Sequence, residues 1–347
     1  MKKNRNIEKT QKVRKQQQQK KQLLFLIGVA AIIVAVVAGL IAKAVLDGKS
    51  EENQVSSDEF SETEDEDVIV FDGKKYVYND HLSNFLFMGI DSSKKIDEQK
   101  TQSDAGQADS IFLIAYDRKE NTLQSLAIPR DTMTEIESFS FSGNSQGMQT
   151  NHLNLQYAYG DGKWKSCELM KTAVSHLLYG VPIQGYCSVK MDAVPILVDI
   201  VGGVEVTVSD DSLQEKYPEF TMGSTVTLTS ENALAYVRYR DTDQENSALV
   251  RQQRHRSFMD GFLAKVQEMS AQDAGIVTDL YEGIQGYMVT NMGNDQFVKL
   301  LDASKHAPVV SETVPGEGAA GAYHDEYHVD EEELYKLIIR MFYEEVN

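Results

Sequence analysis

The clearest hydrophobic pattern in the chain lies between residues 107 and 132. Two apolar runs, the second covering Thr122 to Ile128, flank the polar segment Asp117 to Asn121, which predicts two antiparallel strands joined by a turn. In the first run, one side carries Ile111, Leu113 and Ala115, and the other carries Phe112, Ile114 and Tyr116. Because both sides are apolar, we expect this strand to be buried inside a sheet.

Charged residues occur at one end of this predicted hairpin. Asp109 begins the first strand, whereas Arg130 and Asp131 follow the second. Antiparallel strands place these positions at the same end of the sheet, where a carboxylate and a guanidinium can meet. Such a pair is either a structural ion pair that closes the hairpin or part of a functional site.

The remaining pattern extends this α/β arrangement. Strands are predicted at 68–71 and 75–78 around Asp72-Gly73, at 84–90 ending before Asp91, at 184–189 and at 204–208. Helices are predicted at 151–160, 164–178, 192–201, 231–237 and from 251 to about 269, and residues 92–107 read as a loop. The alternation of strands and helices favours an α/β sandwich with helices on both faces of the sheet.

The N-terminus predicts a membrane anchor. Residues 1–22 contain nine Lys or Arg against one Glu, and residues 23–42 are twenty residues without a charge. This length spans a bilayer as a helix, and the basic flank favours a cytoplasmic tail with the rest of the chain outside the cell. A cleaved signal peptide is the alternative, because Ala42-Lys43-Ala44 resembles a cleavage site, but its apolar region is usually shorter.

The distribution of charge indicates a linker between the predicted anchor and the folded domain. Ten acidic residues and one Lys lie between Asp47 and Asp67, so residues 43–67 are interpreted as a solvated extracellular linker, followed by one domain over 68–347. The net charge is −19, and because residues 1–22 contribute +8, the remainder carries −27. This excess of negative charge excludes a general nucleic-acid-binding surface.

The two cysteines, Cys167 and Cys187, leave two interpretations open. Outside the membrane they could form a disulfide, or they could remain two buried thiols. Their spacing carries no metal-binding signature, and neither has the neighbours of a catalytic nucleophile.

Arginines concentrate in one short part of the acidic domain. Eight Arg lie outside residues 1–22, and five of them fall between 238 and 256. Arg238 and Arg240 are predicted to point to one side of an extended segment. The next helix is predicted to carry one row of side chains formed by Arg251, Arg254, His255, Phe258 and Phe262. A solvated helical face is one explanation, but guanidinium groups also suit multidentate capture of phosphate, which we favour here.

Several motifs together resemble the LytR-CpsA-Psr family of membrane-anchored cell-wall glycopolymer transferases. They are Ala108-Asp-Ser-Ile111, Ala127-Ile-Pro-Arg-Asp-Thr132, Tyr157-Ala-Tyr-Gly160, Leu197-Val-Asp-Ile-Val-Gly-Gly-Val204 and Ala233-Leu-Ala-Tyr-Val-Arg-Tyr-Arg240, with Arg251 and Arg254. The resemblance covers residues 85–266, with a weaker match at Pro315-Gly316 and in the last helix. It implies a central mixed β-sheet flanked by helices on both faces.

The resemblance also implies an activity. This is the transfer of a glycan phosphate from a polyprenyl-pyrophosphate carrier to a peptidoglycan hydroxyl at the cell membrane, with Mg²⁺ as cofactor. Asp109, Asp91 and Arg130 match catalytic positions, and the two carboxylates are the expected metal ligands. The pyrophosphate-binding positions correspond to Arg238, Arg240, Arg251, Arg254, His255, Gln107 and His152.

Three of these positions depart from the family pattern. Gln107 and His152 stand where the family commonly has Arg and Lys, and His255 stands where it has Gln. A histidine near neutral pH is largely uncharged, so cationic charge is reduced. The losses at Gln107 and His152 favour an alternative in which the protein binds polyprenyl phosphates or wall polymer without reacting them. A regulatory role in transcription attenuation is a further alternative, although no helix-turn-helix pattern supports it.

Overall fold

The computed structural model describes residues 68–346 except 93–94, 99–104, 141–142, 240–253, 255–256, 259–260, 263, 267, 270–271, 274, 307–308 and 322–324. The predicted tail, anchor and linker therefore lie outside the described residues. Among the residues that are described, no helix has both the length and the apolar character needed to cross a bilayer. The prediction of an anchor at 23–42 stays a prediction.

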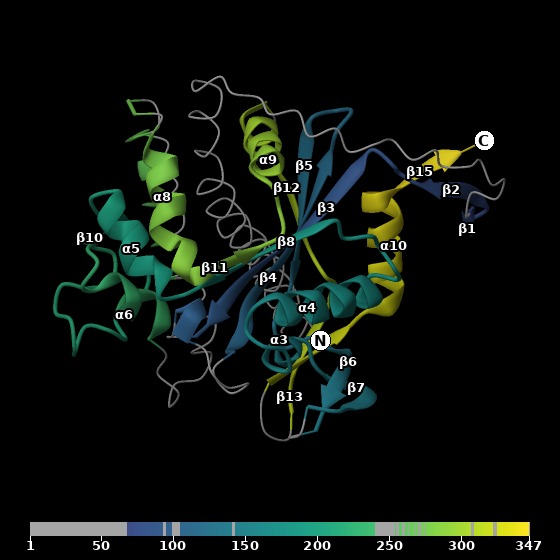
Figure 1. Cartoon of the computed structure of the whole chain (residues 1–347), viewed down its shortest axis with the longest axis horizontal. Helices are drawn as coiled ribbons and strands as arrows, with labels where there is room; N and C mark the ends of the chain where they lie inside the picture. Colours follow the sequence, from purple (N-terminus) through teal and green to yellow (C-terminus); the bar gives the residue numbers. More distant parts are fainter. Residues whose placement is uncertain are drawn as a thin grey trace, which may run out of the picture.

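A mixed six-stranded sheet forms the centre of the molecule (Figure 1). Its strands, in spatial order, are β11 (Met288–Thr290), β8 (Gly185–Lys190), β3 (Leu82–Asp91), β4 (Gln107–Asp117), β5 (Thr122–Ile128) and β12 (Val310–Thr313). The pairs β3–β8 and β5–β12 are parallel, and the other three pairs are antiparallel. The predicted hairpin of β4 and β5 is confirmed at the middle of this sheet.

Helices cover both faces of the sheet, as predicted. One face packs against α3 (Leu155–Ala158), α4 (Trp164–Leu177) and α10 (Glu331–Phe342). The other packs against α5 (Ala193–Ile200), α6 (Ala233–Arg238), α8 (Ile276–Ile284) and α9 (Asn294–His306), together with helical residues between 254 and 269. Figure 1 shows α5, α6 and α8 grouped on the side of the molecule away from α10.

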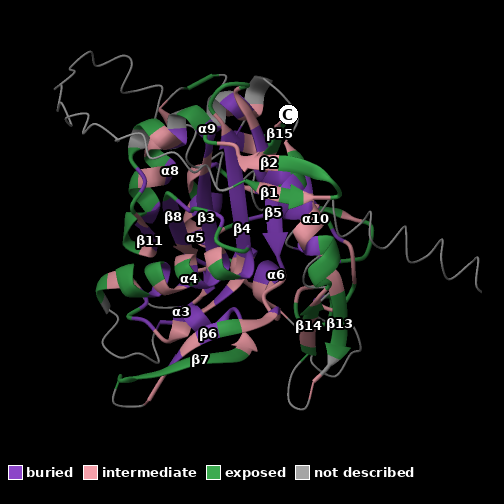
Figure 2. Cartoon of the chain, turned by 90° about the vertical axis from the view of Figure 1, so that its right-hand side faces the viewer, coloured by how far each residue is buried: buried purple, intermediate pink, exposed green. Residues whose placement is uncertain are grey.

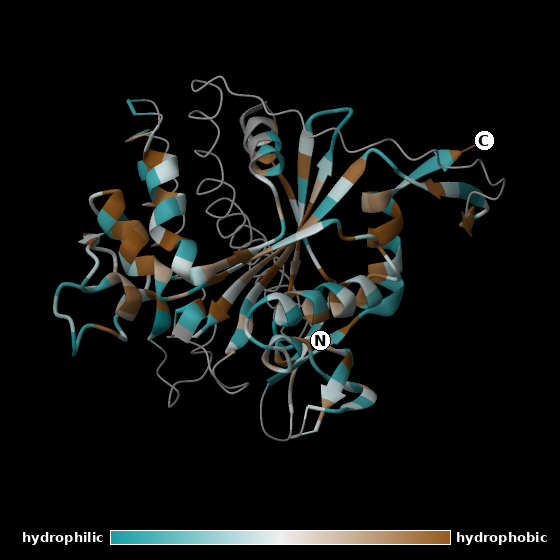
Figure 3. Cartoon of the chain, viewed as in Figure 1, coloured by the Kyte–Doolittle hydropathy of each residue, from teal (hydrophilic) through white to brown (hydrophobic). Residues whose placement is uncertain are grey.

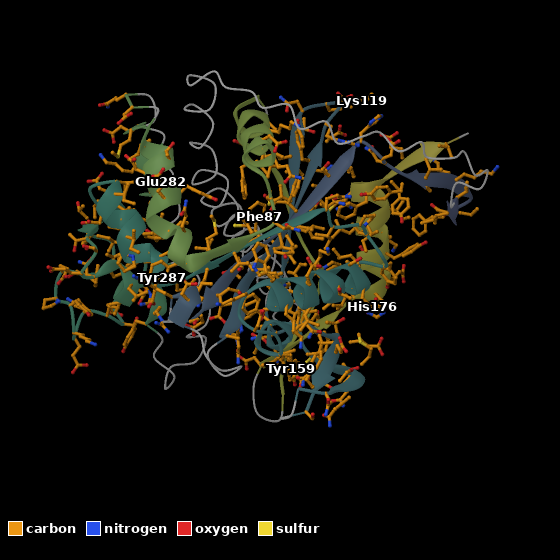
Figure 4. The ribbon with its side chains drawn as sticks, viewed as in Figure 1. Phe87, Lys119, Tyr159, His176, Glu282 and Tyr287 are labelled. Carbon is orange, nitrogen blue, oxygen red and sulfur yellow. The ribbon has the colours of Figure 1, made fainter. Side chains whose placement is uncertain are left out.

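The alternation expected for the first hairpin strand is present. Ile111, Leu113 and Ala115 belong to the hydrophobic cluster beneath α4 and α10, and their neighbours Phe112, Ile114 and Tyr116 belong to the cluster beneath α5 and α8. The central strands are accordingly buried along most of their length (Figure 2). In Figure 4, Phe87 lies at the middle of the sheet and Lys119 at the β4–β5 turn.

The hydropathy of two helices, α5 and α10, matches how much of each is buried (Figure 3). The short helix α5 is apolar over much of its surface because it is covered by both the sheet and α8. In α10, six residues are buried while Glu331, Glu332 and Glu333 lie in the first turn, where the side chain of Asp330 caps the helix by accepting from the Glu333 amide. The predicted C-terminal helix thus closes one face of the core.

Smaller sheets surround this body. They comprise β1 (Ile69–Phe71), β2 (Lys74–Tyr78) and β15 (Tyr343–Val346), the pair β9 (Val204–Thr207) and β10 (Thr225–Leu228), the pair β6 (Met133–Phe139) and β7 (Ser145–His152), and the pair β13 (Gly316–Ala320) and β14 (Asp325–Val329). The predicted β1–β2 hairpin is confirmed, with φ of 50° at Asp72 and 76° at Gly73. The described residues also include 3₁₀ turns at Ile96–Glu98 and Gln285–Tyr287.

Three sequence predictions are wrong in local detail. Residues 145–152 form the strand β7 and not a loop leading into a helix, so the following helix is only the four-residue α3. Arg238 ends α6 and is therefore helical, whereas an extended conformation begins only at Tyr239, with ψ of 132°. The third is a helix cap: the sequence predicts that Thr229 or Ser230 caps the helix at 231–237, whereas α6 begins after Asn232, whose side chain makes no cap bond. Polar β7 has no hydrophobic face, so its pattern gave no strand signal.

The two cysteines are free thiols, which settles the alternatives left open by the sequence. Cys187 packs into the cluster under α5 and α8, whereas Cys167 packs into the cluster under α4 on the opposite face of the sheet. The sheet therefore lies between the two side chains. Burial raises the pKa of the Cys167 thiol to about 12 and also raises that of Cys187.

Candidate active site

A β-bulge shapes the end of the sheet where the charged residues were predicted. Ser110 of β4 pairs with Gly89 of β3. The next pair along these strands joins Ala108 to Ile90, so Asp109 is the extra residue at the bulge. A bulge of this kind bends the strand and changes the direction of a side chain. Asp109 therefore leaves the normal alternation at the point where its carboxylate meets an arginine.

Arg130 makes that contact from the loop after β5. Its Nη1 forms an ion pair with Oδ1 of Asp109, whose side chain is only 3% exposed. Its Nε donates to Oδ1 of Asp131 over 3.1 Å. Arg130 itself is 30% exposed, so part of its guanidinium is open to solvent. The predicted carboxylate–guanidinium pair is present at the predicted end of the sheet.

Gln107 holds the same guanidinium from another direction. Its side-chain oxygen accepts hydrogen bonds from Nη2 of Arg130 over 3.1 Å and from Nδ2 of Asn154 over 3.2 Å. Gln107 is thus a neutral acceptor that orients Arg130. Its expected role in pyrophosphate binding stays a prediction.

The C-terminal hairpin and β7 support the loop that carries Arg130. The amide of Tyr327 in β14 donates to the carbonyl of Asp131 over 2.8 Å, and Tyr327 forms a bridge with Thr132. His152 ends β7, and its Nδ1 lies 3.8 Å from Oδ1 of Asp131. His152 therefore lies beside the Arg130 cluster, although its charge depends on protonation.

A second carboxylate–arginine contact forms on the neighbouring strand. Nη2 of Arg238 in α6 donates to Oδ1 of Asp91, the last residue of β3, over 2.6 Å. Asp91 is directly opposite Gln107 in the β3–β4 ladder. The two arginines are therefore linked through paired positions on adjacent strands, since Gln107 contacts Arg130 and Asp91 contacts Arg238.

Close packing of the backbone fixes the position of Asp91. Gly106 adopts φ of +80°, and a Cβ at this position would lie 2.6 Å from the Asp91 carbonyl oxygen and 2.8 Å from the Cβ of Ser92. A side chain is excluded both by the left-handed backbone and by the lack of space. Glycine at this position allows the loop before β4 to lie against the end of β3.

Asp192 adds a carboxylate that the sequence analysis did not single out. It precedes α5, and its Oδ1 lies 3.6 Å from Nη1 of Arg238, so that arginine spans Asp91 and Asp192. Burial raises the pKa of Asp192. The positive charge of Arg238 lowers this pKa, the negative charge of Asp91 raises it, and the positive charge of Lys190 lowers it. The signal that could have revealed Asp192 was its place just after the strand predicted at 184–189, as Asp91 lies just after the strand predicted at 84–90.

Arg254 occupies a different environment from the one expected. Its side chain is 1% exposed, its Nε lies 3.3 Å from Oδ2 of Asp210, and its Nη2 donates to the carbonyl of Tyr239. Its guanidinium also lies 5.5 Å from the centroid of the Tyr239 ring. Arg254 therefore follows Phe258 and Phe262 into the core, and it braces the segment directly after Arg238.

Three of the predicted phosphate-binding residues lie outside the described residues: Arg240, Arg251 and His255. Of the predicted set that is described, the structure brings Asp91, Asp109, Arg130, Gln107, His152 and Arg238 to one end of the sheet. This arrangement places two arginines among four carboxylates: Asp109 and Asp131 contact Arg130, and Asp91 and Asp192 contact Arg238. It can bind a phosphate-containing group through the guanidinium N–H donors that the carboxylates leave available.

Comparison with known proteins identifies relatives with the same organisation. The model of the LytR_cpsA_psr family matches residues 42–341. A polyisoprenyl-teichoic acid–peptidoglycan teichoic acid transferase, TagU of Bacillus cereus, is 32% identical over 221 residues, which cover 63% of this chain and 67% of TagU.

Solved structures share the fold. The protein gbs0355 from Streptococcus agalactiae aligns with a TM-score of 0.58 and 23% identity, over 75% of this chain and 86% of that protein. TagT bound to LI-WTA aligns with a TM-score of 0.52 and 21% identity, over 75% and 89% of the two chains. The match of the family model over most of the sequence agrees with the motifs and with the mixed sheet. The chain belongs to the LytR-CpsA-Psr family of transferases.

Proposed function

We propose that this protein transfers a glycan phosphate from a polyprenyl-pyrophosphate carrier to a hydroxyl of peptidoglycan. The observation that carries this proposal is the pair of carboxylate–arginine contacts, Asp109 with Arg130 and Asp91 with Arg238, on adjacent strand ends. The name of the Bacillus cereus relative, a polyisoprenyl-teichoic acid–peptidoglycan teichoic acid transferase, supports the same substrate class.

In the proposed reaction, a sugar hydroxyl oxygen attacks the phosphorus that carries the glycan. The bond from this phosphorus to the bridging oxygen of the pyrophosphate breaks, and polyprenyl phosphate leaves with the electron pair. The hydroxyl proton passes to a carboxylate. Asp91 is the better placed acceptor, because its side chain is 38% exposed while that of Asp109 is 3% exposed and held by Arg130.

The arginines stabilise the leaving group. Phosphoryl transfer depends mainly on positioning and on neutralising charge that spreads over phosphate oxygens. Arg130 and Arg238 are 30% and 36% exposed, so each can present N–H groups to a substrate while it keeps its carboxylate partner. Arg240 and Arg251 remain sequence-based candidates for the same role.

The donor set at this end of the sheet fits Mg²⁺ that is held jointly with the substrate. Among the described residues, no group of three or more His, Cys, Asp or Glu side chains could hold a metal ion. Magnesium is usually bound by one or two carboxylates, with phosphate oxygens and water as its other ligands. Asp91 and Asp109 would supply these carboxylates, and the ion would supply positive charge to the phosphates. The contacts between these carboxylates and the arginines do not depend on the ion.

We place the reaction on the outer surface of the cell membrane. The basic tail at 1–22 and the uncharged run at 23–42 support an anchor with its N-terminus in the cytoplasm. A polyprenyl carrier is confined to the bilayer, so an anchor followed by the acidic linker at 43–67 would keep the domain within reach of its donor. Detection of the mature protein in a membrane-free fraction would contradict this arrangement.

A reaction with defined substrates tests the proposal. The full-length protein in detergent is mixed with a synthetic polyprenyl-pyrophosphate disaccharide and peptidoglycan oligomers, with and without Mg²⁺, and the products are measured by mass spectrometry. We expect oligomers whose mass has increased by the disaccharide phosphate, together with an equal amount of polyprenyl monophosphate. Donor binding without either product would select the alternative of a binding protein, which the neutral Gln107 beside Arg130 favours.

A further inference from the structure

The strand β8 ends in a buried lysine, beside the strand that carries Asp91. Lys190 is the last residue of β8, pairs in parallel with Ile90, and is 2% exposed. The residue after Ile90 is Asp91, so the lysine lies one ladder position from the carboxylate that binds Arg238. A buried ammonium group is costly unless nearby negative charge compensates for it. The positive charge of Lys190 lowers the pKa of Asp192, so it acts on that carboxylate, two residues further along the chain.

Asp192 lies two residues further along and faces the same arginine. It occupies the cap position of α5 without making a side-chain cap bond. Its Oδ1 is buried, makes no hydrogen bond among the described residues and lies at the ion-pair distance of 3.6 Å from Nη1 of Arg238. The carboxylate is therefore directed toward Arg238 and does not stabilise its own helix.

These contacts give Arg238 two carboxylate partners from neighbouring parallel strands. Asp91 ends β3 and contacts Nη2, whereas Asp192 follows β8 and contacts Nη1. A guanidinium held at both nitrogens has little freedom to rotate. Two carboxylates around one guanidinium leave excess negative charge where a phosphate must bind, and the positive charge of Lys190 offsets part of that excess.

We propose that Asp192 and Lys190 are positioning residues of the phosphate-binding end of the site. Asp192 holds Nη1 of Arg238 while Asp91 holds Nη2, and Lys190 supplies the buried positive charge that allows an anion to bind beside these carboxylates. This inference rests on the proposed function for the identity of the anion, a pyrophosphate group. The pairing of Asp192 with Lys190 is testable without any turnover.

The first test measures affinity for inorganic pyrophosphate by calorimetry on the full-length protein. Lys190→Met should weaken binding about tenfold, because one positive charge near the anion is lost. Lys171→Met on α4 is the control, since Lys171 lies on the surface beside Glu168 and should leave affinity unchanged. Binding by Lys190→Met as tight as that of the control would overturn the role of Lys190.

The second test separates positioning from charge attraction. Asp192→Asn should leave pyrophosphate affinity equal or tighter, because a repelling carboxylate is lost, while transfer from the donor falls about tenfold because Arg238 is less constrained. Asp199→Asn, an exposed position on the same helix, is the matched control. If Asp192→Asn matched Asp199→Asn in both affinity and turnover, the role of Asp192 would be wrong.

The third test measures thermal unfolding and does not depend on catalysis. Lys190→Met should lower Tm by several degrees, because the carboxylates lose a compensating charge, and adding Asp192→Asn should restore at least half of the loss. A double variant that melts no higher than Lys190→Met would contradict the pairing. A protein that shows this rescue but no glycan transfer would retain the pairing and refute only the proposed reaction.

Discussion

The guanidinium of Arg238 lies 2.6 Å from the carboxylate of Asp91, although 147 positions separate these residues in the chain. The contact joins the end of α6 to the end of β3. A second arginine, Arg130, reaches the adjacent strand at Asp109. Two carboxylates from neighbouring strands thus each hold one arginine at the same end of the sheet, and the following predictions depend on that arrangement.

Replacing Asp109 with Asn should reduce glycan transfer at least about a hundredfold, because Arg130 loses the buried partner that orients it. The measurement is the initial rate of transfer with the polyprenyl-pyrophosphate donor, accompanied by Tm to separate catalysis from unfolding. Glu120→Gln, an exposed change in the β4–β5 turn at the opposite end of the hairpin, should leave both quantities unchanged. Equal rates for the two variants would exclude a role for Asp109.

Gly106→Ala should reduce both Tm and turnover, because the added Cβ would lie 2.6 Å from the Asp91 carbonyl oxygen in a backbone with φ of +80°. Gly143→Ala is a close control, since Gly143 has the same φ but no atom within 4 Å of the added Cβ. Both changes carry the conformational cost of a left-handed residue, of about 1 kcal/mol. The additional loss for Gly106→Ala therefore measures the steric contact with Asp91, and equal losses would show that this contact is unimportant.

Arg254→Met should destabilise the fold by about 3–5 kcal/mol, because a buried guanidinium is removed and the carboxylate of Asp210, which is 13% exposed, loses its arginine partner. Urea unfolding of Arg254→Met and of the double variant with Asp210→Asn checks this expectation, and the double variant should recover part of the lost free energy. If Arg254 instead contacts phosphate directly, Arg254→Met would keep its stability and lose pyrophosphate affinity. That outcome would restore the role that the sequence suggested.

The buried thiols should make the fold less stable at high pH. Burial raises the folded-state pKa of Cys167 to about 12, so the unfolded chain releases this proton at lower pH than the folded chain does. The protonated Cys167 thiol therefore contributes its full stabilisation below the ordinary thiol pKa, and this stabilisation is lost as the pH rises toward 12. Near pH 10.5 the free energy of unfolding should have fallen by on the order of 2 kcal/mol for this reason. Unfolding of Cys167→Ala should show a smaller decrease between pH 8 and 10.5 than the wild type, and reductant should not change the Tm of either.

Local pattern was sufficient for much of the fold. The two apolar sides of β4 and the turn at Asp72-Gly73 each depend on neighbours along the chain, and both were predicted correctly. The predicted hairpin also placed Asp109 and Arg130 together, because antiparallel pairing determines which strand ends meet.

Other parts of the site depend on contacts that no local pattern contains. The bulge at Asp109 arises from the pairing of β4 with β3, and the position of Asp192 arises from the parallel pairing of β8 with β3. Arg254 is an arginine on the predicted helical row, which is the pattern of a surface phosphate ligand. Its side chain is instead buried in the core beside Asp210 and Tyr239. The strand β7 has a single apolar residue, Met148, and so no apolar face from which its pairing with β6 could be inferred.

The most direct test of the central claim is the rate of glycan transfer by Arg238→Ala compared with Arg340→Ala. Both changes remove an arginine paired with a carboxylate, but Arg340 lies on the exposed side of α10 beside Glu312. We expect Arg238→Ala to lose at least about a hundredfold in kcat/KM, because the leaving phosphate is no longer stabilised, whereas Arg340→Ala should match the wild type. Equal kcat/KM for the two variants would contradict the assignment of this end of the sheet as the active site.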